Sequence, residues 1–205
     1  MAYIFEELQT TMTDKRAMLD IGCGNRKRPG AVGIDINPDT DADVVHDLNS
    51  FPYPFPDSSY DDIFMDNVLE HLDNVVGVME EIHRISKPGG LVKVIVPYFR
   101  ARWAFIDPTH KHFFTTESFT YFDPGHIHNK LFNYSKATFL VEKLVFNENI
   151  RHRGLLRLIV MPFKYIANIW PSRYEILLSH LFPMDDLTFY LRTVKTGTQR
   201  TLHNE

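Results

Sequence analysis

The stretch Leu19-Asp20-Ile21-Gly22-Cys23-Gly24 decides the fold, because it joins a short apolar run to a pair of glycines. Continuous apolar runs of this kind are typical of parallel β-strands that are buried on both faces. Glycine lets the backbone turn sharply and pass close to a ligand. Ligands of parallel α/β sheets bind beyond the carboxyl ends of the strands. We therefore expect a strand over residues 17–21 with a binding site at its end.

Four more apolar runs predict parallel strands of the same sheet. They are residues 31–36, 43–48, 61–65 and 91–97. Two later runs, residues 139–145 and 187–193, alternate apolar and polar side chains and predict two further strands.

Two segments of the chain have helical character. The first carries apolar side chains at the 3.6-residue period of an amphipathic helix and ends at Lys87-Pro88-Gly89-Gly90. Its apolar positions are Val75, Val78, Met79, Ile82 and Ile85. The second segment lies between the two alternating strands. Its later half opens on a predicted capping box, Ser172 to Glu175, followed by an apolar face. That face comprises Tyr174, Leu177, Leu178 and Leu181.

Acidic residues follow the second and third predicted strands. Asp35 closes the second strand, where a carboxylate can accept hydrogen bonds from both hydroxyls of a ribose. Asp47 follows the third strand, where it can accept from an adenine amino group while Leu48 covers the ring. Each of these features alone is also found in turns and helix caps, so their order along the chain is the informative property.

This order resembles the type-11 group of class I S-adenosylmethionine-dependent methyltransferases. The resemblance spans residues 17–100 and rests on the glycine turn, the two acids, the stretch Asp66-Asn67-Val68-Leu69-Glu70-His71-Leu72 and the Lys-Pro-Gly-Gly sequence. It implies an α/β fold with a Rossmann-like sheet of seven strands, the last antiparallel, and a helical insertion between strands six and seven.

The resemblance also implies a cofactor and a division of the chain. The cofactor is S-adenosylmethionine, with Gly22 and Gly24 against its methionine part, Asp35 on its ribose and Asn67 near its sulfonium. The implied cofactor-binding residues are Asp20, Gly22, Cys23, Gly24, Asp35, Ile36, Asp47, Leu48 and Asn67. Residues 1–205 form one methyltransferase domain, with a cofactor-binding core at 13–100 and acceptor-side cap segments at 98–134 and 150–184.

The connection between the first two predicted strands is shorter than a usual crossover. Residues 25–30 are too few for the dozen or so residues that such a connection normally needs. We expect no full helix there, and a cofactor pocket that is open on that side or covered by the N-terminal segment. Arg26, Lys27 and Arg28 in this connection either reach an anionic substrate or form a solvated loop.

The methyl acceptor is expected to bind under the two cap segments, because both begin or end where the parallel strands end. The methyl group of the cofactor is already activated, so the enzyme chiefly aligns the acceptor for in-line attack. An oxygen or nitrogen acceptor also needs a base, and histidine suits that role near neutral pH. We predict His110 as the base, oriented by Asp107, acting on a small-molecule or glycan acceptor. The alternative is that these residues only bind their own loop.

Two pairs, His110-x-His112 and His126-x-His128, raise the question of a metal site. No cysteine accompanies them and their spacing matches no common site, so we predict no metal. A nicotinamide-dependent oxidoreductase is a second hypothesis, disfavoured because Lys27 occupies the position of the third glycine in its fingerprint. A third hypothesis is a protein that binds S-adenosylmethionine without catalysis.

The composition limits which partners and which cellular compartment we expect for the protein. The net charge of -4 gives no general attraction to nucleic acid, which we do not expect as a partner. The single cysteine, Cys23, permits no intrachain disulfide, so we expect a cytoplasmic protein. Residues 155–169 are apolar but too interrupted to span a membrane. For residues 151–170 three roles stay open: a lid, the face of a homodimer, and a peripheral membrane contact.

Overall fold

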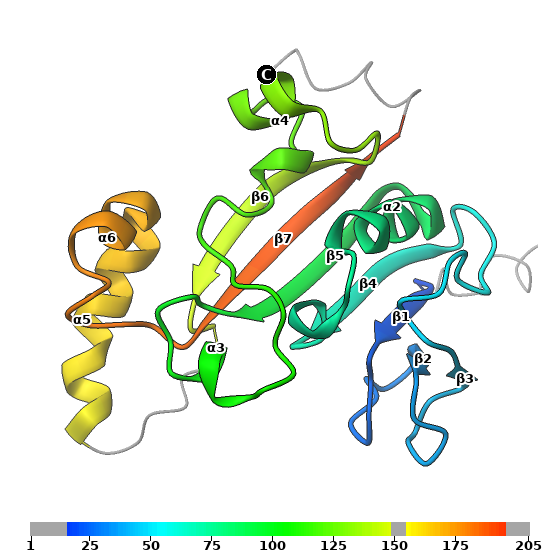
Figure 1. The fold of residues 1–205 in the computed structure, drawn as a ribbon, viewed down its shortest axis with the longest axis horizontal. Coiled ribbons are helices and arrows are strands. Elements are labelled where there is room, and N and C mark those ends of the chain that lie inside the picture. Colours follow the sequence, from blue (N-terminus) through cyan, green and yellow to red (C-terminus); the bar gives the residue numbers. More distant parts are fainter. Residues whose placement is uncertain (1–15, 149–154, 196–205) are drawn as a thin grey trace, which may run out of the picture.

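The computed structural model describes residues 16–148 and 155–195. Expectations about the N-terminal segment as a cover of the cofactor pocket, and about residues 150–154 at the start of the insertion, lie outside the described residues. Within the described ranges, the chain forms one mixed sheet with helices around it (Figure 1).

The sheet has seven strands in the order β3-β2-β1-β4-β5-β7-β6. Their bounds are β1 Met18–Ile21, β2 Val32–Asp35, β3 Val44–Val45, β4 Tyr60–Asp66, β5 Ser86–Pro97, β6 Thr138–Phe146 and β7 Asp186–Val194. The first five strands are parallel to one another, and β7 is antiparallel to both β5 and β6. The expected fold class is confirmed, although β3 is only two residues long. The edge at which β1, β2, β4 and β5 end is called the carboxyl-end rim below.

Helix α2 (Val75–Ile85) is found where its period predicts it. Its apolar stripe is buried, with Val78, Met79, Ile82 and Ile85 all 0% exposed. The helix begins at Asn74, whose side chain accepts a hydrogen bond from the backbone N–H of Gly77 at 2.9 Å. The Lys-Pro-Gly-Gly sequence does follow the helix, but it forms the irregular beginning of β5 and not a separate turn.

The predicted capping box is wrong. Helix α6 (Pro171–Leu177) has Trp170 at its N-cap with no side-chain cap, because Pro171 supplies the first helical residue. Glu175 instead accepts the backbone N–H of Thr116 at 2.8 Å, which ties α6 to the other cap segment. The expected apolar face is also only partly buried, since Leu177 is 64% and Leu181 62% exposed.

The short connection between β1 and β2 contains turns and no helix, as expected. Two of its basic residues are engaged by the protein itself. Lys27 pairs with Asp43 at 2.8 Å, and the guanidinium of Arg28 lies 4.4 Å from the ring centre of Phe64. This arrangement favours a structural role for these two side chains.

Only the first part of the 98–134 segment lies at the carboxyl-end rim. Because β6 runs parallel to β5, it has to start at the opposite rim, so the chain must cross the sheet before it. Helix α3 (Trp103–Ile106) lies near the end of β5, and the chain then passes η2 (Thr120–Phe122) to reach α4 (Ile127–Phe132) beside the start of β6 (Figure 1). Phe119 packs on Phe189 of β7 along this crossing, with 4.5 Å between ring centres.

The insertion between β6 and β7 forms helices α5 (Leu155–Ile169) and α6 at the side of the sheet (Figure 1). Asn147 joins its two ends, because its side-chain oxygen accepts the backbone N–H groups of Asp185 at 2.6 Å and Asp186 at 3.1 Å. None of the helices in the described ranges is both long enough and apolar enough to cross a membrane.

Candidate functional site

The glycine turn at the end of β1 has two positions that require glycine for different reasons. Both Gly22 and Gly24 have left-handed backbone angles, with φ of 65° and 51°. A Cβ atom at Gly22 would overlap the side chain of Val68, so this glycine permits close packing of the turn against the chain after β4. Within the described part of the chain, a Cβ atom at Gly24 would meet no atom within 4 Å. The backbone of Gly24 is therefore open to the approach of a ligand.

Asp35 connects this turn to the end of β2. One carboxylate oxygen accepts the backbone N–H of Gly24 at 2.9 Å, and the other accepts that of Asn37 at 2.9 Å. Each carboxylate oxygen can accept two hydrogen bonds, so Asp35 keeps capacity for two further donors. Two hydroxyls of a ribose would fill that capacity.

Three residues expected at the adenine differ in their exposure. Ile36 is 62% exposed directly after Asp35, and Asp47 is also exposed. Leu48 is 5% exposed and belongs to the hydrophobic core. Its contact with an adenine ring stays a prediction.

The other expected cofactor residues lie around the turn. Asp20 is buried, accepts the backbone N–H of Arg28 at 2.8 Å, and has its pKa raised by that burial. Burial also raises the pKa of the Cys23 thiol. Asn67 follows β4 with a φ of 54°, and its backbone N–H donates to Ile95 at 2.9 Å. The geometry of the glycine turn, of Asp35 and of Asn67 fits a nucleoside-bearing cofactor at the carboxyl-end rim.

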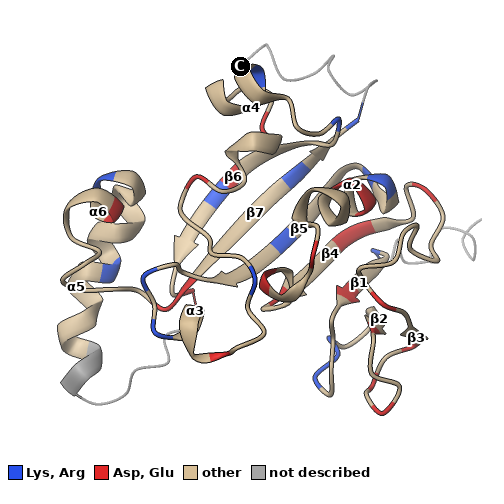
Figure 2. Cartoon of the chain, in the orientation of Figure 1, with Lys and Arg blue, Asp and Glu red and all other residues tan. Residues whose placement is uncertain are grey.

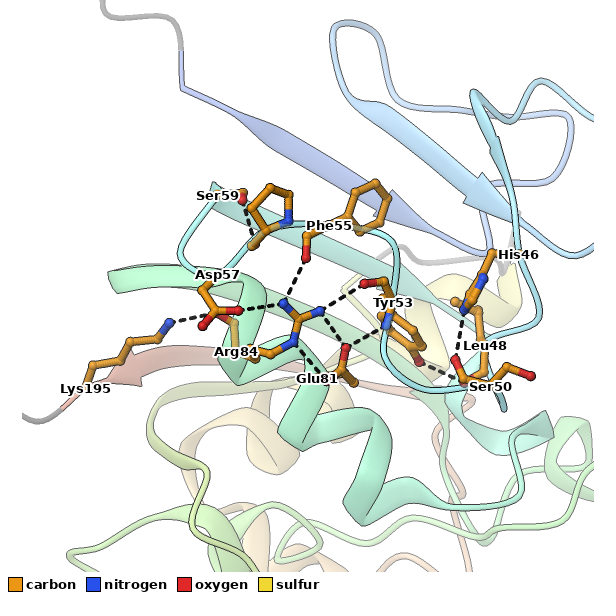
Figure 3. Close-up of polar contacts among 11 residues, drawn as sticks. His46, Leu48, Ser50, Tyr53, Phe55, Asp57, Ser59, Glu81, Arg84 and Lys195 are labelled. Atoms are coloured by element: carbon orange, nitrogen blue, oxygen red, sulfur yellow. Dashed lines mark hydrogen bonds and ion pairs between the residues drawn. The ribbon is translucent and has the colours of Figure 1, made fainter.

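A network centred on Arg84 holds the loop that carries Asp47 and Leu48 (Figure 3). The guanidinium binds both carboxylate oxygens of Glu81, at 3.0 and 2.7 Å. It also donates to the carbonyl groups of Phe55 and Tyr53. The Tyr53 hydroxyl then donates to the carbonyl of Leu48 at 2.9 Å. This chain of contacts fixes the loop of Asp47 and Leu48 to α2.

A buried carboxylate lies next to the predicted base His110. Glu70 is in the short helix η1 (Leu69–His71), is 1% exposed, and burial raises its pKa to about 7. Its Oε1 lies 3.9 Å from Nε2 of His110. The backbone carbonyl of Glu70 accepts the N–H of Lys111 at 2.8 Å, which brings the His110 loop to η1. In the sequence, Glu70 is recognisable only as part of the stretch Asp66 to Leu72.

Asp107 makes its side-chain hydrogen bonds with Thr109 and not with His110. One oxygen of Asp107 accepts the Thr109 hydroxyl at 2.6 Å and its backbone N–H at 2.9 Å. The Thr109 hydroxyl in turn lies 2.8 Å from Nδ1 of His71. Asp107 therefore orients His71 through Thr109, while His110 is held by the carbonyl of Ala104, 3.1 Å from its Nδ1.

The two His-x-His pairs do not converge. Nε2 of His112 bonds to the carbonyl of Leu72 at 2.9 Å. His126 and His128 lie at α4, at the opposite rim, where His128 bonds to Thr120 and stacks on Tyr121. The crossing of the sheet by residues 115–134 explains this separation.

Both cap segments line a cavity of about 370 Å³ beyond the end of β5. Its lining residues are Phe99, Arg100, Phe105, Ser179, His180 and Pro183. A larger cavity of about 570 Å³ involves Glu80, His83 and Tyr134, near the start of β6 and thus at the opposite rim from the glycine turn. The smaller cavity is therefore the better candidate for an acceptor pocket.

Comparison with known proteins shows what part of the chain and its fold are similar to. Residues 19–94 match the protein family described as "Methyltransferase domain". A S-adenosylmethionine-dependent methyltransferase from Archaeoglobus fulgidus has a similar structure, with 17% identity, a TM-score of 0.54, and coverage of 93% of this chain and 91% of that one. No curated protein matches the chain.

Two further structures have the same fold. One is a chain from the complex between the Haloferax volcanii Trm112 methyltransferase activator and a putative methyltransferase, with 16% identity, a TM-score of 0.54, and coverage of 93% of this chain and 89% of that one. The other is a S-adenosylmethionine-dependent methyltransferase from Mesorhizobium loti, with 14% identity, a TM-score of 0.52, and coverage of 92% and 96%.

The strand order and the glycine turn define a class I methyltransferase fold. The match of residues 19–94 to the methyltransferase domain family agrees with the resemblance found in the sequence and with the expected enzyme class. The cofactor of this class, S-adenosylmethionine, is confirmed with it.

Proposed function

We propose that this enzyme transfers the methyl group of S-adenosylmethionine to an oxygen or nitrogen atom of a small-molecule or glycan acceptor. The observation that carries this proposal is the pair of Glu70 and His110, with 3.9 Å between the carboxylate and Nε2. Glu70 follows Asn67 closely in the chain, at the rim that also carries the glycine turn, and the loop after Asp107 brings His110 to it. Groups that can activate an acceptor thus lie next to the groups proposed to bind the cofactor.

His110 can take a proton from an acceptor through one defined atom. Because the carbonyl of Ala104 can only accept a hydrogen bond, Nδ1 of His110 carries the proton of the neutral ring. Nε2 then keeps a lone pair on the side of Glu70. A base of this kind contributes roughly 10²–10⁴-fold to a rate. In this proposal Glu70 replaces Asp107 as the carboxylate partner of His110.

The acceptor is proposed to bind between the cap segments, in the cavity lined by aromatic and basic residues that include Phe99, Arg100 and His180. Stacking on an aromatic ring and pairing with a cation suit a sugar or a small acid. Nucleic acid is not proposed as a partner, because Lys and Arg are interspersed with Asp and Glu over the described elements (Figure 2).

The outer surface of the insertion also has a proposed role in recognition. Large apolar side chains are exposed on α5 and α6, among them Leu158, Tyr165, Trp170 and Ile176. A lid, a homodimer face and a peripheral membrane contact through residues 151–170 remain the three alternatives, and the activator in the Haloferax complex adds a helper protein as a fourth. We place the reaction in the cytoplasm, as the single cysteine suggests.

Binding and transfer assays test this function. Isothermal titration with S-adenosylmethionine and with NADH separates a methyltransferase from the oxidoreductase alternative, and binding of NADH alone would refute the proposal. Transfer of a labelled methyl group to a panel of sugars and small acids then identifies the acceptor.

On that acceptor His110→Ala should lose roughly 10²–10⁴-fold in turnover with unchanged cofactor affinity. His128→Ala, at the opposite rim, is the matched control. Cofactor binding without transfer by any acceptor would favour the non-catalytic alternative.

A further inference from the structure

We infer that Glu70, His71 and His110 form a binding site for a divalent transition-metal ion. Each of the three side chains offers one ligand atom, and these atoms all lie within 4.8 Å of one another. Two imidazoles and one carboxylate are a ligand set that zinc, manganese and iron(II) accept, and it leaves coordination positions open. Glu70 and His71 are neighbours in η1, and the loop after Asp107 supplies His110.

The hydrogen bonds around the two histidines prepare both rings for this role. Nδ1 of His110 donates to the carbonyl of Ala104, so Nε2 is the nitrogen that can bind a metal. The Thr109 hydroxyl gives its only proton to the carboxylate of Asp107, 2.6 Å away. It must therefore accept from Nδ1 of His71, at 2.8 Å, which leaves Nε2 of His71 as the ligand atom. A ligating histidine in metalloproteins commonly donates its other N–H to a carbonyl or to a carboxylate-linked group in this way.

The surroundings of the Glu70 carboxylate favour a bound cation independently of the histidines. This carboxylate is almost wholly buried, yet neither oxygen has a hydrogen-bond partner on any other described residue. The nearest cationic candidate, Nε2 of His110, is 3.9 Å away, which is too far for a hydrogen bond. A buried carboxylate without partners is rare because its desolvation is uncompensated. A cation between Glu70 and the two histidines would satisfy both oxygens.

The backbone holds the three ligands in place without the ion. The carbonyl of Glu70 accepts the N–H groups of Lys111 at 2.8 Å and of His112 at 3.3 Å. Lys111 also pairs with Asp73 at 2.6 Å, beyond the other end of η1. The His110 loop is thus attached to η1 on both sides of the cluster, so the ligand set does not depend on the metal to assemble.

The consequence for catalysis rests on the proposed function, whereas the binding does not. A hydroxyl oxygen of the acceptor that occupies an open position on the ion would have its pKa lowered and would lose its proton more readily. The resulting oxygen nucleophile would attack the methyl carbon of the sulfonium, with S-adenosylhomocysteine as the leaving group. In the metal-bound enzyme, His110 would then act as a ligand, and the acceptor proton would pass to solvent.

The test measures metal binding by the full-length protein in the absence of acceptor. After treatment with a chelator and its removal, the protein is titrated with Zn²⁺ and Mn²⁺ by calorimetry and with Co²⁺ by visible absorption. We expect one ion per chain at this site. Glu70→Gln, which keeps the shape of the side chain, and His110→Ala should each abolish it or weaken it by more than tenfold. Thr109→Val, which removes only the partner of His71, should weaken it roughly 10–100-fold.

His112→Ala and His128→Ala are the controls, and both should bind the ion as the unmodified protein does. Thermal melting of every variant shows which of them are folded. If Glu70→Gln or His110→Ala does not fold, Thr109→Val still tests the site. The inference is overturned if none of the three ions binds, or if binding survives both Glu70→Gln and His110→Ala. Binding without methyl transfer would refute the proposed function alone, and methyl transfer that resists chelation would refute the catalytic role of the ion.

Discussion

Asp35 accepts the backbone N–H of Gly24 across the ends of β1 and β2, with 2.9 Å between Oδ2 and the nitrogen. The carboxylate therefore orients the glycine turn and still has capacity for two hydroxyl donors. If these are the ribose hydroxyls of S-adenosylmethionine, Asp35→Ala should remove hydrogen bonds worth roughly 1.5–3 kcal/mol each. We expect cofactor binding at least tenfold weaker in calorimetric titration.

Asp35→Asn is the matched control for this prediction. It keeps one oxygen that can accept from Gly24 but loses the charge, so its affinity should lie between those of the unmodified protein and of Asp35→Ala. Equal affinity of Asp35→Ala and the unmodified protein would show that the ribose binds elsewhere.

Gly24→Ala tests whether the cofactor contacts the glycine turn. A left-handed backbone costs a residue with a Cβ roughly 1–2 kcal/mol, so the variant should melt at a lower temperature. This strain is present with and without ligand and cannot by itself change the affinity. Because a Cβ here meets no atom of the described residues, we expect any large loss of affinity for S-adenosylhomocysteine to come from a clash with the ligand.

Gly89→Ala provides the comparison. Gly89 also has a positive φ, of 73°, and a Cβ at this position also meets no atom of residues 16–148 or 155–195 within 4 Å. It lies at the start of β5, at the opposite rim from the glycine turn. The two variants should lose similar stability, and only Gly24→Ala should lose cofactor affinity. Similar affinities for both would place the cofactor away from Gly24.

Tyr53→Phe tests the link between α2 and the loop of Asp47 and Leu48. The variant removes the one hydroxyl that donates to the carbonyl of Leu48 and leaves this buried carbonyl without it. We expect a loss of roughly 1–3 kcal/mol in unfolding free energy, measured with urea. Arg84→Lys should destabilise the protein as well, because an ammonium cannot reproduce the fork that binds Glu81, Phe55 and Tyr53 together. Unchanged stability of both would show that the loop is held by its apolar contacts alone.

The sequence predicted the parallel half of the sheet because buried parallel strands leave a local signal. Residues such as Leu19, Ile21 and Ile63 are fully buried and occur in short apolar runs, and each run ends at a turn. The 3.6-residue spacing of apolar side chains predicted α2 equally well. The short β3 was predicted too long, because only Val44 and Val45 of the predicted 43–48 strand pair with β2.

The Glu70–His110 contact and the crossing before β6 depended on contacts between distant parts of the chain. Glu70 meets His110 because backbone groups of Lys111 and His112 bind the carbonyl of Glu70, and no spacing in the sequence encodes that contact. One signal was present, since Glu70 stands near Leu69 and Leu72, and a carboxylate close to apolar neighbours favours burial. The crossing of the sheet before β6 follows from strand directions, and it accounts for the separation of His110 from His126.

His83 joins α2 to the end of β7, because its Nε2 lies 2.8 Å from the carbonyl of Val194. Burial lowers the pKa of His83 below its ordinary value, the Val194 carbonyl opposes that shift, and the positive charge of Lys195 adds to it. The unfolded chain therefore binds the proton before the folded protein does. Stability from this group is complete above the unfolded pKa of about 6.5 and is lost as the pH falls below it.

His83→Gln removes this titration and keeps an N–H that can donate to Val194. At pH 8 the variant and the unmodified protein should have similar unfolding free energies in urea. Below about pH 6.5 the unmodified protein should lose stability more steeply, by up to about 1.4 kcal/mol per pH unit for the one proton, down to the folded pKa. His71, whose pKa burial also lowers, titrates in both proteins, so the difference between them isolates His83. Parallel stability curves from pH 8 to pH 5 would show that protonation of His83 is not linked to folding.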